Sequence, residues 1–100
     1  MDFIQAYGYL DMMCRNMLHN NRGVSAYLEQ MRNTPDGATV VQGWEDDLKR
    51  LEECRRIRNV FAHYPQTQQE DRTEAIRWLS EFAARIMSGT DPITQYQKAT

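Results

Sequence analysis

The sequence is poor in the features that mark secreted and membrane-spanning proteins. It has only two cysteines in 100 residues, Cys14 and Cys54, at apolar positions of two separate predicted helices. Because so sparse a pair is not a disulfide framework, we expect two reduced core residues of a cytoplasmic protein. No apolar run reaches the roughly 18 residues that cross a bilayer, and no basic stretch precedes an apolar one at the N-terminus. We therefore expect neither export nor a membrane partner.

The chain also lacks an excess of positive charge. Its 12 lysines and arginines face 14 aspartates and glutamates, for a formal net charge of −2. Phosphate neutralisation supplies most non-specific affinity for nucleic acids, so charge alone should not hold RNA or DNA. The distribution is uneven, because residues 49–63 contain five basic residues and two glutamates. For Lys49, Arg50 and Arg56 we favour ion pairs on a solvated helix face.

Residues that bind metals or cofactors are not clustered. No group of His, Cys, Asp and Glu has the spacing of a metal site. Neither a glycine-rich phosphate loop nor a nucleophile elbow is present. We expect no metal and no other cofactor.

Apolar residues do recur at helical spacing, and short links separate the helical segments. The predicted helices are 2–18, a short extra helix at 24–32, 43–63 and 70–87. Between them we expect a turn at 33–37, an extended connector at 38–41 and a polar loop at 66–69, and residues 93–96 should pack back as a short turn. Pro65 disfavours helical geometry at the residue before it, which ends the third helix near His63. The pattern predicts one domain over 1–100, an all-α antiparallel four-helix-type bundle.

The helix predicted at 43–63 has an arginine within its apolar stripe. Counted at 100° per residue from Trp44, one arc contains Leu48, Leu51, Cys54, Arg55, Arg58, Phe61 and Ala62. A guanidinium stays charged and is costly to bury alone, so Arg58 should have a partner or a function. Asp11, beside the stripe of the first helix, is a candidate partner.

The spacing Arg58-Asn59-x-x-x-His63 resembles the Arg-x4-His signature of HEPN domains. These are small all-helical domains, and many are metal-independent ribonucleases that act as homodimers. Segments 23–28, 43–44 and 90–92 are also similar to small bacterial proteins of this general type. The resemblance implies a HEPN-like bundle that dimerises through the Arg58/His63 end of the third helix.

The resemblance also implies roles for individual residues at a site shared by two subunits. His63 would handle the proton of a ribose 2′-OH, and Arg58 would stabilise charge on the phosphoryl oxygens, giving a 2′,3′-cyclic phosphate. Asn59 would orient a phosphate or a water, and Arg55 and Tyr64 complete the predicted substrate-binding set. The substrate would be single-stranded RNA.

Five residues separate Arg58 from His63, about 140° on a continuous helix, so the two do not share a face. Either the helix ends at His63 and the imidazole swings round, or a twofold dimer brings two helix ends together. Toxin-type HEPN proteins also bind a cognate antitoxin, and many have a tyrosine two residues after the histidine. Here that position is Pro65, and Tyr64 is one residue early.

Two other interpretations stay open. In the first, the protein is a non-catalytic dimeric binding or scaffold module, whose cleft holds a nucleotide, an anion or a partner protein with Arg58 as the clamp. In the second, both residues are structural: Arg58 pairs with Asp11 or a helix-terminal carbonyl, and His63 lies near the negative end of the helix dipole.

Overall fold

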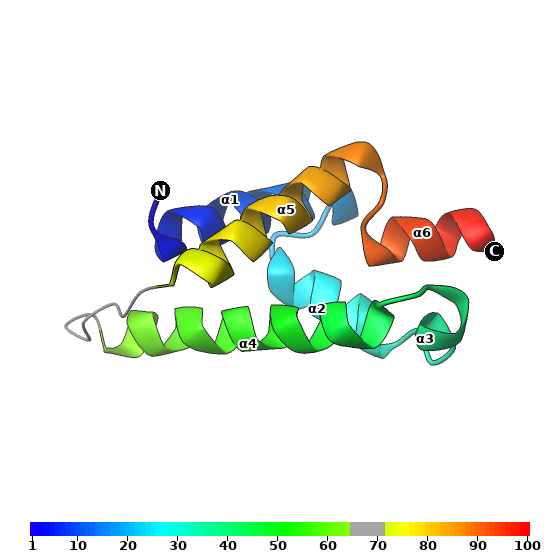
Figure 1. The fold of residues 1–100 in the computed structure, drawn as a ribbon, viewed down its shortest axis with the longest axis horizontal. Coiled ribbons are helices and arrows are strands. Elements are labelled where there is room, and N and C mark those ends of the chain that lie inside the picture. Colours follow the sequence, from blue (N-terminus) through cyan, green and yellow to red (C-terminus); the bar gives the residue numbers. More distant parts are fainter. Residues whose placement is uncertain (65–71) are drawn as a thin grey trace.

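The computed structural model describes residues 1–64 and 72–100, and the regular elements in these ranges are helices. In chain order they are α1 (Phe3–Leu18), α2 (Val24–Arg32), α3 (Gly37–Val40), α4 (Trp44–His63), α5 (Thr73–Ser88) and α6 (Pro92–Ala99). The prediction of an all-α helical bundle is confirmed (Figure 1). None of the described helices is long and apolar enough to cross a membrane.

The long helix α4 runs antiparallel to both α1 and α5 (Figure 1). Phe3 at the start of α1 lies edge-on to Phe61 near the end of α4, with ring centroids 5.8 Å apart. Arg85 near the end of α5 pairs with Asp47 near the start of α4, at 2.9 Å. Helices α1 and α5 pack closely against each other, and the short α2 crosses between this pair and α4.

Side chains from these four helices form one hydrophobic core. Tyr27 of α2 and Phe82 of α5 meet edge-to-face at 5.4 Å between ring centroids, and both are excluded from solvent. Cys14 and Cys54 are free and buried, which confirms their prediction as core residues. Burial raises the pKa of the Cys14 thiol to about 12 and that of Cys54 to about 11.

The corner between α5 and α6 is tied to α2 by the buried side chain of Asp91. Its Oδ2 accepts hydrogen bonds from the Tyr27 hydroxyl at 2.6 Å and from the backbone N–H of Thr94 at 3.3 Å. The Tyr27 hydroxyl in turn accepts the backbone N–H of Ile93 at 3.1 Å. Burial and then the Asp91 carboxylate raise the pKa of Tyr27. Asp91 thereby caps α6, so the tail predicted as a short turn is an eight-residue helix.

One other segment differs from the sequence prediction. The expected extended connector at 38–41 is wrong for residues 38–40, since α3 spans Gly37–Val40. Val41 is extended, and its backbone N–H donates to the Gly37 carbonyl at 2.8 Å. A helical turn satisfies this backbone locally, whereas a lone extended strand would leave it unpaired. Pro65, the predicted loop at 66–69 and the first residues of the predicted helix 70–87 lie outside the described residues.

The apolar stripe of α4 does not include Arg58, so that prediction is wrong. The buried positions of α4 are Trp44, Leu51, Cys54 and Ile57, whereas Arg58 is exposed. In the second half of α4 the buried residues are Cys54 and Ile57, which face the first turn of α5. Arg58 lies on a different face of the helix. An exposed guanidinium also avoids the desolvation cost that burial would impose.

Candidate functional site

A polar groove of about 470 Å³ lies where α4 approaches α1 and the α1–α2 connection. We call it the arginine groove, because four arginines and one aspartate supply its charged side chains. Its local charge is therefore positive, although the whole chain carries −2. The lining residues are Ile4, Tyr7, Gly8, Asp11, Arg15, Asn21, Arg22, Ser25, Arg55, Arg58 and Asn59.

Three of the five predicted site residues line the arginine groove, and all three come from α4. Arg55, Arg58 and Asn59 are three and four positions apart, so they share one face of the helix. The Arg55 Nε donates to Ser25 Oγ at 2.9 Å, which holds this half-buried side chain against α2. Arg58 is exposed and makes no hydrogen bond or ion pair with any described residue.

Asp11 closes the corner between α1 and α2 at one wall of the groove. Its Oδ1 accepts the backbone N–H of Val24 at 2.8 Å, and its Oδ2 lies 3.4 Å from the Arg15 Nε. Gly23 has φ of +58°, and a Cβ there would collide with the Asp11 carboxylate, so only glycine fits this turn. Asp11 is therefore engaged elsewhere, and the predicted pairing with Arg58 is wrong.

Two further arginines line the groove, and sequence reasoning did not assign them to the site. Arg15 lies in the last turn of α1, and Arg22 lies in the connection, where it pairs with Glu29 of α2 at 2.6 Å. Neither belongs to a motif. The only signal in the sequence was their charge, and the packing of α1 against α4 is what brings them near Arg58.

Tyr7 lines the groove as a buried aromatic residue. Burial, followed by the charge of Asp11, raises the pKa of its hydroxyl to about 12, while Arg55 and Arg58 act in the opposite direction. These charges act on the phenol because Tyr7, Arg55 and Arg58 line the same groove.

The other two predicted site residues, His63 and Tyr64, do not line the groove. His63 is the last residue of α4 and Tyr64 follows it, and both are exposed. Because α4 stays helical through His63, its imidazole points away from the face that carries Arg58. Within one chain the helix end therefore does not bring Arg58 and His63 together.

The chain belongs to a protein family described as "Family of unknown function (DUF6548)", whose model matches residues 1–100. Comparisons with curated proteins and with solved structures gave no match. The family description assigns no activity, so the groove has to be interpreted from its own chemistry.

Proposed function

We propose that this protein is a binding module that holds the phosphate groups of RNA in the arginine groove. The observation that carries the proposal is Arg58, an exposed guanidinium with no ion pair among the described residues, lying beside three other arginines. A guanidinium binds phosphate oxygens through two parallel hydrogen bonds, which suits a backbone phosphate.

The other groove arginines can add to this interaction at little cost. The pair between Arg22 and Glu29 is half-exposed on both sides, and such surface pairs contribute at most about 1 kcal/mol. Arg22 can therefore exchange its glutamate for a phosphate. Asn59 offers an amide that can donate to or accept from a ribose hydroxyl.

Fluorescence anisotropy with a labelled single-stranded RNA tests this proposal. Arg58→Ala should weaken Kd about tenfold, because a charge-assisted hydrogen bond to phosphate is lost. The slope of log Kobs against log salt should become shallower by about 0.7, corresponding to one phosphate contact on a single strand. Arg77→Ala, which removes an exposed arginine of α5 outside the groove, is the control and should bind like the wild type. Absence of binding by the wild type, or an equal loss in both variants, contradicts the proposal.

A second candidate function is metal-independent endoribonuclease activity. It is favoured by His63, an exposed imidazole on the same helix as Arg58 that has no hydrogen-bond partner among the described residues. In the reaction, His63 would accept the proton of a 2′-OH as the 2′-oxygen bonds to phosphorus. The bond from phosphorus to the 5′-oxygen breaks, and that oxygen takes up a proton. The products are a 2′,3′-cyclic phosphate and a 5′-hydroxyl.

Because the two side chains lie on different faces of α4, this activity needs a homodimer in which one subunit supplies Arg58 and the other His63. Mixing Arg58→Ala with His63→Ala protein tests the requirement, since a heterodimer of the two then contains one intact site. In EDTA each variant alone should be inactive, and the mixture should recover part of the wild-type cleavage. An RNA with a single 2′-deoxyribose at the cut position should resist cleavage. Binding without any cleavage by the wild type leaves the binding module as the function.

A further inference from the structure

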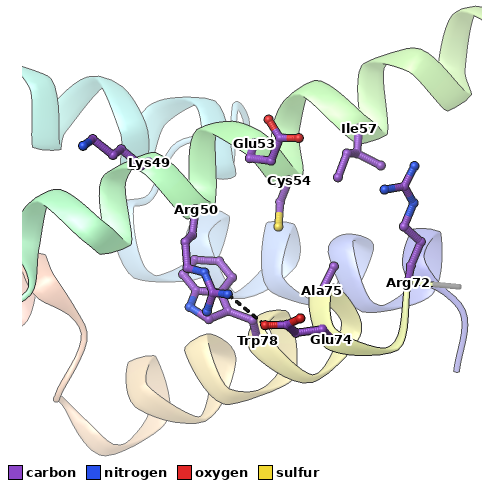
Figure 2. A pocket seen from close by; sticks show the side chains of 9 residues that line it. All are labelled: Lys49, Arg50, Glu53, Cys54, Ile57, Arg72, Glu74, Ala75 and Trp78. Atoms are coloured by element: carbon purple, nitrogen blue, oxygen red, sulfur yellow. Dashed lines mark hydrogen bonds and ion pairs between the residues drawn. The ribbon is translucent and has the colours of Figure 1, made fainter.

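A second cavity, of about 420 Å³, lies between α4 and the start of α5 on a different face of α4 from the arginine groove. Four apolar or weakly polar side chains form its walls: Cys54, Ile57, Ala75 and Trp78. In Figure 2, Cys54 extends from α4 toward α5, and Lys49 and Arg72 lie at opposite ends of the cavity. This volume is in the range of about 300–1,000 Å³ that is usual for small-molecule sites.

The charged groups around this cavity are not all neutralised by one another. Glu74 pairs with Arg50 at 3.2 Å, and the Arg50 guanidinium also lies 5.8 Å from the centre of the Trp78 ring. Glu53 pairs with Arg56 at 2.6 Å. Both acidic residues of the cavity are thus engaged by arginines.

The remaining cations, Lys49 and Arg72, form no hydrogen bond or ion pair with a described residue, although the charge of Arg72 adds to that of Arg56 in lowering the pKa of Glu53. The Nε of Arg72 is shielded from solvent and still has no hydrogen-bond acceptor in the part of the chain that the structure describes. A shielded donor without an acceptor is unfavourable, and an anion placed in the cavity would remove this penalty.

We infer that this cavity binds a small organic anion, a carboxylate with an apolar body. Its carboxylate oxygens accept hydrogen bonds from Arg72, and its apolar body covers Cys54, Ile57 and Ala75. The site is separate from the RNA-binding groove, so its ligand is distinct from the RNA.

Titration with 2-naphthoate, followed by ¹H–¹⁵N NMR, tests this inference. Saturable shifts are expected at the Trp78 indole N–H and the Arg72 Nε–H, with few changes in the arginine groove. The uncharged 2-naphthalenemethanol has nearly the same shape and should bind at least tenfold more weakly, because it lacks the charge that Arg72 recognises. No saturation up to a few millimolar, or equal affinity for the alcohol, overturns the inference.

Variants separate this site from the groove. Arg72→Gln should weaken naphthoate binding about tenfold, and Ala75→Leu should block it by filling the cavity. Arg77→Gln, which changes an exposed arginine of α5 outside the cavity, is the matched control and should keep wild-type affinity. Arg58→Ala should weaken RNA binding about tenfold and retain naphthoate binding. Equal losses in Arg72→Gln and Arg77→Gln would show general charge attraction and overturn the site.

Discussion

At the α5–α6 corner the Asp91 carboxylate is buried and held through one of its two oxygens, whereas in the arginine groove Arg58 is exposed and unpaired among the described residues. Asp91 is excluded from solvent and bonds to the Tyr27 hydroxyl. Arg58 makes no such bond with a described residue. A buried charge without partners is too unfavourable for a small domain to keep, but an exposed one costs little and stays free for a ligand. The comparison suggests that the corner serves stability and that the groove serves binding.

The largest effect on stability is expected at the wall of the groove, where the chain is constrained, and not at its arginines. Gly23→Ala should lower the free energy of unfolding by about 4 kcal/mol, because it adds backbone strain and displaces the Asp11 side chain that caps α2. Urea denaturation measures this loss. Gly8→Ala is the control: this glycine lies inside α1 with no atom within 4 Å of where the added methyl group would lie, so stability should rise by about 0.5–1 kcal/mol. Equal effects of both substitutions would contradict the assignment of Gly23.

The buried corner should show the next largest effect. Tyr27→Phe removes one hydroxyl, which leaves the Ile93 N–H without its acceptor and the buried Asp91 Oδ2 with only the 3.3 Å bond from Thr94, for an expected loss of about 3 kcal/mol. Tyr96→Phe removes a similar hydroxyl that donates to the exposed Asp36 at 2.7 Å, and it should lose less than about 1 kcal/mol. Thermal unfolding of both variants gives the comparison. A loss at Tyr27 no larger than that at Tyr96 would remove the distinction between the two regions.

Tyr7, which lines the groove, should make the free energy of unfolding depend on pH. Its pKa is raised from 10.0 to about 12 in the folded chain, so the unfolded chain releases this proton first as pH rises. The stabilisation is fully present below pH 10 and is lost as pH rises through 12. Tyr7→Phe should therefore reduce the loss of stability between pH 8 and pH 11 by about 1 kcal/mol. Urea denaturation under reducing conditions measures it, and the exposed Tyr9→Phe, which should keep the wild-type loss, is the control.

The smallest effect on stability is expected for the residue on which the proposed function depends. Arg58→Ala should change the free energy of unfolding by less than about 0.5 kcal/mol, since the side chain is exposed and unpaired among the described residues. Arg85→Ala should lose more, about 1–2 kcal/mol, because Arg85 makes two hydrogen bonds to Asp47. If Arg58→Ala unfolds the protein, Arg58 has a structural role and the groove proposal fails.

The local sequence was a good guide to where helices begin and end. Asp2 and Gln5 form the reciprocal capping bonds that start α1, and the acidic first turn of α4 matches its dipole. Residues 38–40 were predicted to be extended because the segment contains β-branched residues. Such residues favour strands mainly through packing against a neighbouring strand, and none of the described residues forms one here. No role for Asp91 was predicted, since its burial depends on Tyr27, which is 64 positions away in the sequence.

The candidate site was predicted in part. Arg55, Arg58 and Asn59 do share one surface, because their spacing on a helix is a local property. His63 and Tyr64 lie outside it in a single chain, and Arg15 and Arg22 join it from elements that no motif connects to α4.

The sequence by itself determines the all-α class, most of the helix bounds and which side chains are positively charged. These properties depend on periodicity, capping and side-chain chemistry, which act over a few turns of helix. The packing of the helices was needed to show that Ile57 and not Arg58 enters the core, that four arginines meet in one groove and that Asp91 is buried. These outcomes depend on how helices distant in the sequence pack against one another, because that packing decides which side of each helix is buried.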